Sequence, residues 1–372
     1  ISASNNINFK NILVGDIWLC GGQSNMDYNI NQYTKTAGEV GTAYTAIVDG
    51  SDSFPKVRVA LMKKHAAKPG QTYVPFEDNE IFKGKWQSST TQVTPHLSAV
   101  GYVFARKLHQ HLDIPIGLID ANKGGSRIES WMSSAALSEV GLKYRGRSYF
   151  NSMLATYKDF PIKGFIWYQG ESNALSVEDA LSYENKFKAM IEDWRSKFND
   201  KEMPFLYVQL AAYERNPYLQ GITYPVIRDS QKAALELPYT AMVVASDLGL
   251  RTNIHPPYKL EVSERLVLAA RKVAYGESVV HSGPAFMKAV YKNSQVQVSF
   301  DLLGSALQIK SIELDGKTLS SDKLEGFEIA AADKVFHVAK AVISGDKVIL
   351  SSSKVSKPVA VRYAYRGFPY AN

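Results

Sequence analysis

The chain has 372 residues, of which 45% are hydrophobic and 21% are charged, which is ordinary for a globular protein. This length allows one large domain and a smaller one. The formal net charge of +7 can attract anions, but the basic residues are scattered and form no arginine-rich run, so the sequence does not support nucleic-acid binding.

In chain order, residues 11–283 alternate apolar strands with amphipathic helices, which favours a parallel sheet covered by helices on both faces. Before them, residues 1–10 are a candidate short edge strand, and within them the segment 27–90 is irregular and is expected to be mostly loops. The expected elements are strands over 12–19, 114–121, 204–210 and 241–245, a strand from 165 that ends in a polar turn, and helices over 97–112, 183–198, 225–235 and 261–275.

The pattern changes after residue 283, where short alternating strands replace helices. Asp315-Gly316 and Gly345-Asp346 are typical of hairpin turns, and 295–300, 347–351 and 359–363 are expected strands. We therefore predict an all-β module over 284–372.

A Gly-Gln-Ser-Asn-Met stretch at 22–26 directly follows the first predicted strand. A turn there places a hydroxyl at the carboxyl edge of the sheet, where open α/β folds bind ligands, so Ser24 is a candidate nucleophile. The pattern is not the Gly-x-Ser-x-Gly elbow of α/β-hydrolases, because Met26 stands where the second glycine would be.

Metal and disulfide chemistry find little support. The single cysteine, Cys20, excludes an intramolecular disulfide and the usual cysteine-based zinc sites, and no acidic residue pairs with a histidine at ligand spacing. Neither glycine pair matches a phosphate-binding loop, and no apolar run is long enough to cross a bilayer. We expect no metal, no cofactor and no membrane span.

Two further segments follow predicted strands, namely Trp-Tyr-Gln-Gly-Glu-Ser-Asn at 167–173 and the loop 246–256 that contains His255. Together with Gly-Gly-Ser at 124–126 and the motif at 22–26, they resemble the blocks of SGNH-type esterases, and most closely the sialate O-acetylesterase family of carbohydrate acetylesterases. The resemblance extends from about residue 9 to about residue 365.

This resemblance implies an SGNH-like three-layer α/β/α fold with a parallel sheet, and a C-terminal module that contributes to a β-sandwich. It also implies that Ser24 is the nucleophile and His255 the base. Because the family usually has strands before the hydrolase domain and continues beyond the module, we expect this chain to be a fragment of a longer protein or a compact variant.

The third catalytic group is where the sequence departs from the family pattern. Many SGNH enzymes have an aspartate three residues before the histidine, but Thr252 stands there and Asn253 follows. Asp247 is the nearest acid in sequence and would complete a triad. The alternative is a Ser-His dyad in which the backbone carbonyl of Asn253 or a neighbour orients the ring, and we expect the dyad.

For the oxyanion we expect the backbone N–H groups of Ser24 and of Gly125 or Gly124, with one side-chain amide. Gln169 is the first choice for this amide and Asn173 the second. Glu171 is expected to be a structural hydrogen-bond acceptor.

The sequence therefore predicts a serine carbohydrate O-acetylesterase acting on O-acetylated sialic acid. The alternatives are an acetylxylan-type esterase and, from another class, a non-catalytic carbohydrate-binding protein on a hydrolase scaffold. Because the chain begins at Ile1 rather than at a methionine, we expect a processed bacterial protein, secreted or periplasmic, whose signal peptide is absent from this chain. The sequence does not indicate the acetyl position or the oligomeric state.

Overall fold

The computed structural model describes residues 10–36, 38–67, 77, 79–82, 84–143, 146 and 148–372. Within them, seven strands form one sheet in the order β3-β2-β4-β1-β5-β6-β7, and all neighbours run parallel except the edge strand β3. The strands are β1 (Asp16–Gly22), β2 (Val57–Leu61), β3 (Gln87–Ser88), β4 (Ile116–Asn122), β5 (Gly164–Tyr168), β6 (Phe205–Val208) and β7 (Thr240–Val243).

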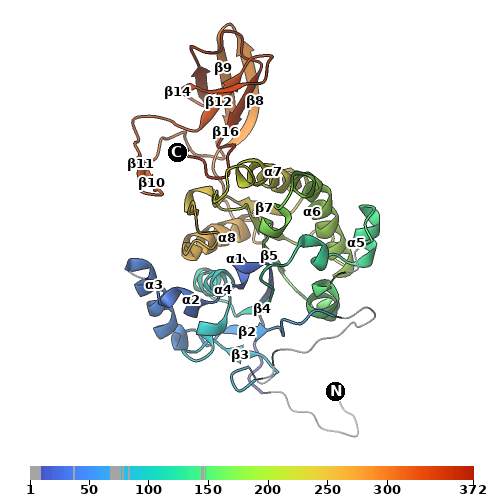
Figure 1. Ribbon diagram of the computed structural model, residues 1–372. Coiled ribbons are helices and arrows are strands. Elements are labelled where there is room, and N and C mark those ends of the chain that lie inside the picture. The colour runs from blue at the N-terminus through green and yellow to red at the C-terminus, as the bar shows by residue number, and fades with distance from the viewer. Residues whose placement is uncertain are drawn as a thin grey trace.

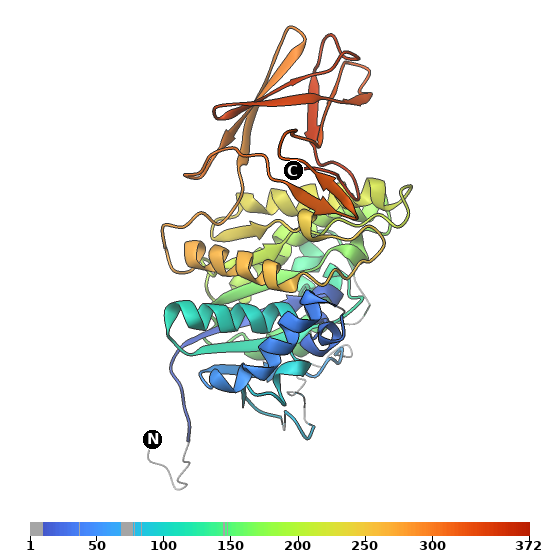
Figure 2. The same cartoon turned by 90° about the vertical axis from the view of Figure 1, so that its left-hand side faces the viewer.

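Helices cover both faces of this sheet. Helix α4 packs against α8 on one face and α6 against α7 on the other, so the predicted three-layer α/β/α architecture is confirmed (Figures 1 and 2). The helices of the described residues are α1 (Ser24–Asp27), α2 (Ile30–Thr34), α3 (Glu39–Asp49), α4 (Ala99–Leu112), α5 (Ser134–Glu139), α6 (Val177–Lys197), α7 (Gln220–Ala233) and α8 (Lys259–Val273).

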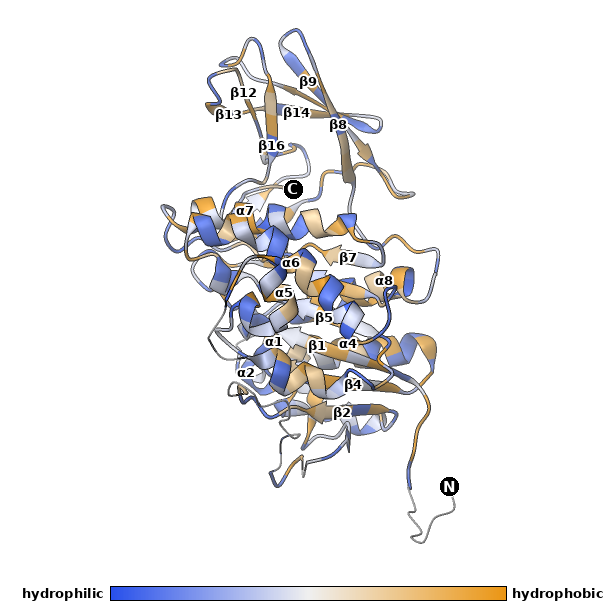
Figure 3. Ribbon diagram, turned by 90° about the vertical axis from the view of Figure 1, so that its right-hand side faces the viewer, coloured by the Kyte–Doolittle hydropathy of each residue, from blue (hydrophilic) through white to orange (hydrophobic). Residues whose placement is uncertain are grey.

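The central strands are apolar because they are covered on both sides. Every residue of β4 and β5 is buried, as expected for inner strands of a parallel sheet. Figure 3 shows hydrophobic residues concentrated in strands such as β2 and β4. Helix α6 completes this core through its apolar stripe, in which the Trp194 ring contacts Phe165 and Trp167 of β5 edge-on.

Several predicted boundaries were wrong for physical reasons. Strand β1 begins at Asp16, and Val14 before it is 90% exposed, because this part of the apolar run precedes the sheet. Helix α6 begins at Val177, because the Ser176 side chain accepts from a backbone N–H of its first turn and caps it. Helix α7 begins at Gln220, ahead of Pro225.

Two further expectations concern the N-terminal part of the chain. The segment 27–90, expected to be mostly loops, contains helix α3 and the inner strand β2. The predicted strand over 1–10 falls on residues 1–9, which lie outside the described residues, and on Lys10, which is not in a strand.

The C-terminal residues form a small β-sandwich-like module, as predicted. A four-stranded sheet in the order β14-β15-β9-β8 and a three-stranded sheet in the order β13-β12-β16 share one apolar core, and β10 pairs with β11 in a separate hairpin. The module lies beyond α7, at one end of the α/β part (Figure 1). Its strands are β8 (Ala285–Lys292), β9 (Gln295–Asp301), β10 (Ile312–Leu314), β11 (Lys317–Leu319), β12 (Phe327–Ala330), β13 (Phe336–Val338), β14 (Lys340–Ser344), β15 (Lys347–Ser351) and β16 (Ala360–Tyr363).

Candidate active site

Ser24 lies at the carboxyl end of the central strand β1, where it is the first residue of α1. The preceding turn requires glycine at position 22, which adopts φ of 144°. A Cβ atom there would lie 2.2 Å from the carbonyl oxygen of Tyr168 in the neighbouring strand β5. The close approach of β1 and β5 thus fixes the turn that presents Ser24.

His255 reaches Ser24 from the loop between β7 and α8. Its Nε2 atom lies 2.8 Å from Ser24 Oγ, which is hydrogen-bond distance. The ring stacks on Tyr28 with centroids 4.3 Å apart, and the backbone N–H of His255 donates to Asn253 Oδ1 at 2.9 Å. The structure therefore brings together the serine and histidine that the sequence singles out, and it uses the Asn253 side chain to hold the histidine backbone.

The environment of His255 favours its neutral form. Burial, and after it the charge of Lys259, lower the pKa of the ring below its ordinary value of 6.5. A neutral imidazole at pH 7 can accept the hydroxyl proton of Ser24, which is what a general base requires.

Asp247 is turned toward a different partner. Its two carboxylate oxygens accept from Arg265 of α8 at 2.7 and 2.6 Å. Among the described residues, no carboxylate is hydrogen-bonded to the ring of His255. The geometry therefore favours the dyad over a triad that includes Asp247.

The glycine pair at 124–125 faces the same turn as Ser24. The N–H of Gly124 donates to Asp27 at 2.7 Å, and Asp27 is the last residue of α1. Gly125 has φ of 70° and open space where a Cβ would stand. Because the Gly124 N–H is already bonded, Gly125 and Ser24 are the better candidates for backbone oxyanion donors.

The side-chain amides proposed for the oxyanion are placed otherwise. Gln169 is fully buried, and its amide nitrogen lies 3.1 Å from Gln23 Oε1, 2.8 Å from Asn173 Oδ1 and 3.2 Å from the Ser126 carbonyl. Asn173 is fully buried as well and donates to Glu129. This placement contradicts an oxyanion role for either amide, because each is already bonded within the protein. Both hold the surrounding turns together.

Glu171 also belongs to the support of the site. It accepts a hydrogen bond from Asn25, the residue after Ser24, and burial raises its pKa. Asn25 in turn contacts Lys259, which is the first residue of α8 and which the sequence reasoning missed. A cation at a helix N-terminus opposes the helix dipole, and this anomaly is the signal that could have found it.

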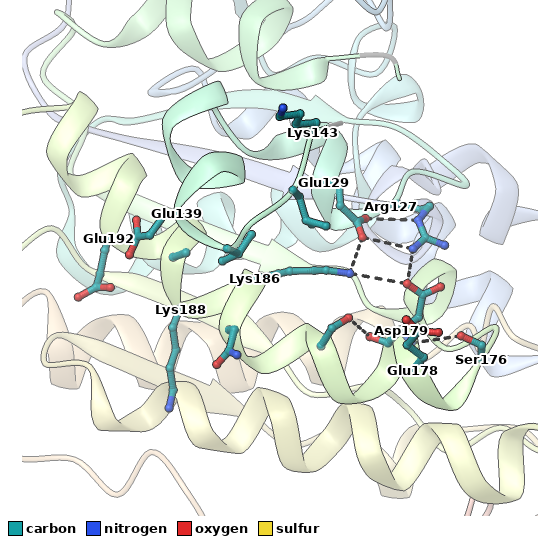
Figure 4. Close-up of a pocket in the computed structure, with 15 residues that line it drawn as sticks. Arg127, Glu129, Glu139, Lys143, Ser176, Glu178, Asp179, Lys186, Lys188 and Glu192 are labelled. Atoms are coloured by element: carbon teal, nitrogen blue, oxygen red, sulfur yellow. Dashed lines mark hydrogen bonds and ion pairs between the residues drawn. The ribbon is translucent and has the colours of Figure 1, made fainter. Parts of the chain in front are cut away.

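A charged pocket of about 790 Å³ lies beside this site but is not lined by Ser24 or His255. Figure 4 shows Arg127 and Lys186 converging on Glu129 and Asp179 at its wall. Burial disfavours ionisation of Glu129, but hydrogen bonds from Lys186 and Arg127 outweigh it and lower the pKa of Glu129 to about 2. These four side chains neutralise one another through the ion pairs that join them.

Cys20 is fully buried, and burial raises the pKa of its thiol well above the ordinary value. Within the described ranges, no three His, Cys, Asp or Glu side chains are grouped so that they could hold a metal ion. In the same part of the chain, no helix has the length and apolar composition to span a membrane.

A family model described as "Carbohydrate esterase, sialic acid-specific acetylesterase" matches residues 14–263, a segment that contains both Ser24 and His255. The chain belongs to this carbohydrate esterase family. It is 32% identical to the sialate O-acetylesterase of Homo sapiens over 309 residues, which cover 73% of this chain and 56% of the relative. The chain thus spans little more than half the length of that curated relative.

Two other similar proteins extend the comparison. The sialate O-acetylesterase of Mus musculus is 29% identical over 428 residues, covering 96% of this chain and 74% of the relative. Among solved structures, a novel carbohydrate acetylesterase from Xanthomonas citri is 36% identical and superposes with a TM-score of 0.82, covering 95% of this chain and 76% of that one. The likeness includes most of the chain, and the predicted family is confirmed.

Proposed function

We propose that this chain is a serine esterase that hydrolyses O-acetyl groups of carbohydrates, with O-acetylated sialic acid as its substrate. The observation that carries the proposal is the 2.8 Å contact between Ser24 Oγ and His255 Nε2 at the carboxyl edge of the sheet. Membership of a carbohydrate esterase family supports the same chemistry.

Acylation begins when Ser24 Oγ attacks the carbonyl carbon of the acetyl group while His255 Nε2 takes the hydroxyl proton. The carbonyl oxygen becomes an oxyanion that accepts from the backbone N–H groups of Ser24 and Gly125. His255 then gives its proton to the sugar oxygen as the bond between that oxygen and the acetyl carbon breaks. The sugar leaves as an alcohol, and the acetyl group stays on Ser24.

Deacylation repeats these steps with water in place of the serine hydroxyl. His255 takes a proton from water, the resulting hydroxide attacks the acetyl-Ser24 ester, and the ring returns the proton to Ser24 Oγ. Acetate is released and the enzyme is restored. One water molecule is consumed for each acetyl group released, and Ser24 and His255 return to their starting protonation states.

The preference for sialic acid rests on two observations. The curated relatives are named sialate O-acetylesterases. The formal net charge of +7 also favours the approach of an anionic sugar over that of a neutral one.

The test compares acetate release from O-acetylated sialic acid and from acetylxylan by the wild type and by Ser24→Ala. Ser138→Ala is the matched control, because this exposed hydroxyl only donates to a backbone carbonyl within α5. We expect Ser24→Ala to lower kcat by more than about 10³-fold and Ser138→Ala to leave it unchanged.

Each other outcome points elsewhere. Normal turnover by a folded Ser24→Ala protein would place the nucleophile at another residue. Preferred hydrolysis of acetylxylan would make the chain an acetylxylan-type esterase. Sugar binding without hydrolysis of any acetyl ester would favour a carbohydrate-binding protein.

A further inference from the structure

The backbone carbonyls of the residues on both sides of His255, Ile254 and Pro256, accept hydrogen bonds from side chains of other parts of the fold. Asn25 Nδ2 donates to the carbonyl of Ile254 at 3.0 Å, and Lys259 Nζ donates to the carbonyl of Pro256 at 2.7 Å. The two donors are also joined to each other, since Lys259 Nζ donates to Asn25 Oδ1 at 2.7 Å. The backbone of the histidine is therefore tied on both sides to the residue that directly follows the nucleophile.

Keeping a lysine in this place is costly. Lys259 is 1% exposed, and burial lowers its pKa to about 7 although Glu171 opposes the shift. Its ammonium lies over the rings of Tyr168 and Tyr33, at 5.5 and 5.9 Å from their centroids. Because a buried cation at a helix N-terminus destabilises the fold, its presence indicates a task other than helix stability.

That task is the orientation of the imidazole. In a Ser-His-Asp triad, a carboxylate bonded to the second ring nitrogen sets the tautomer and the direction of the ring. The described residues place no carboxylate there, and the stack on Tyr28 fixes the ring plane without fixing its distance from Ser24. Control of the ring position then passes to the backbone of His255.

We propose that Lys259 and Asn25 are the positioning residues of this site, holding the backbone on both sides of His255 so that its ring meets Ser24 without a bonded carboxylate. Glu171 completes the network, because it accepts from Asn25 and so orients the amide. The inference rests on the proposed roles of Ser24 and His255.

The test substitutes Lys259→Met, which keeps an unbranched apolar chain and removes both hydrogen bonds. Arg195→Met is the matched control. Arg195 is 4% exposed and also donates to two backbone carbonyls, those of Met203 at 2.9 Å and Tyr239 at 3.1 Å. These carbonyls lie just before β6 and β7, at the opposite edge of the sheet.

We expect Lys259→Met to lower kcat about 10²-fold while KM changes little, because a small displacement of a catalytic group has an effect of this size. Arg195→Met should lower the melting temperature and leave kcat unchanged. Such a division between kcat and KM separates positioning from a general loss of stability.

Ser24→Ala, measured in the same assay, distinguishes failure of the positioning role from failure of the proposed esterase function. Wild-type kcat in folded Lys259→Met, or a change confined to KM, overturns the positioning role while an inactive Ser24→Ala leaves the proposed function standing. An active Ser24→Ala overturns the proposed function itself. Should Lys259→Met fail to fold, Asn25→Ala, which keeps the lysine, is judged by the same division between kcat and KM.

Discussion

His255 acts as a base only while its ring is neutral, so its ionisation should set the acid limb of the pH profile. Burial and the charge of Lys259 lower its pKa below 6.5, and therefore kcat/KM should fall only as the pH drops below that value. Lys259 itself has a pKa of about 7 and is charged across this limb. In Lys259→Met that charge is lost, the pKa of His255 rises, and the limb should move to higher pH.

Measurement of kcat/KM between pH 4 and 8 checks this expectation. Lys107→Met is the control, because this partly exposed lysine of α4 pairs with Glu264 of α8 and should not shift the limb. A wild-type limb above pH 6.5, or a limb that stays in place in Lys259→Met, would contradict it.

The acid at position 247 offers a second comparison between single residues. Because Asp247 is bonded to Arg265 on both oxygens, Asp247→Asn should lower kcat by less than about tenfold, whereas loss of a true triad carboxylate costs about 10⁴-fold. Arg265→Met removes the same ion pair from the other side and should give a similar small effect. Steady-state kinetics of both variants distinguish the dyad from the triad. A large loss of kcat in Asp247→Asn alone would show that Asp247 is the triad carboxylate.

At the scale of the elements, Glu129 connects the turn after the glycine pair to helix α6 by an ion pair. It accepts from Lys186 at 2.7 Å, and both side chains are buried. Glu129→Gln leaves the buried lysine with only its longer contact to Asp179, at 3.6 Å, so the free energy of unfolding at pH 7 should fall by about 3 kcal/mol. Because the folded-state pKa of about 2 lies below the ordinary value of 4.5, this contribution is fully present above pH 4.5 and is lost as the pH falls toward 2.

Urea unfolding at several pH values measures this difference. Glu184→Gln is the control on the same helix, since its pair with Lys188 is only partly buried and should contribute less than about 1 kcal/mol. A difference between wild type and Glu129→Gln that stays constant from pH 7 to pH 2 would show that ionisation of Glu129 is not its cause.

The sequence predicts which residues of the site follow a strand, but it does not predict which way their side chains point. Ser24 and His255 were found because each follows a strand, and strand ends of a parallel sheet meet at one edge. Gln169 follows a strand too, but an end position does not indicate whether a side chain turns toward solvent or into the core, and this one is buried. Lys259 was missed because a single lysine beside a predicted helix is ordinarily a surface residue.

The fold shows the same division. Long periodic segments such as α4 and α6 were predicted, whereas β2 was not. Strand β2 has only five residues, which is too short to give a clear periodic pattern. Its position between β3 and β4 also depends on pairing with strands far along the chain.

At the scale of the whole molecule, the module docks on the loop that carries the histidine. Arg251, four residues before His255, pairs with Asp315 of the β10–β11 turn at 3.1 Å and lies 4.8 Å from the ring centroid of Phe368. Arg251→Ala should therefore uncouple the module, splitting one calorimetric unfolding transition into two and speeding proteolysis of the connecting segment 276–284.

Arg362→Ala is the control for this uncoupling, because that arginine pairs with Glu328 inside the module. It should lower the stability of the module without exposing the connecting segment to protease. An unsplit transition with unchanged protection in Arg251→Ala would show that the docking depends on other contacts.

The same docking decides how the protein can be dissected. Arg228 of α7 is buried and donates to the carbonyls of Arg366 and Gly367, and Ala212 packs against Phe368 in a small apolar cluster. A recombinant fragment ending at residue 283 would lose all of these partners. Arg228 would then lack its carbonyl acceptors, and the apolar surface around Ala212 would be exposed to solvent. Such a truncation invites aggregation during expression, so crystallisation trials and variant libraries should carry the chain through its final residues.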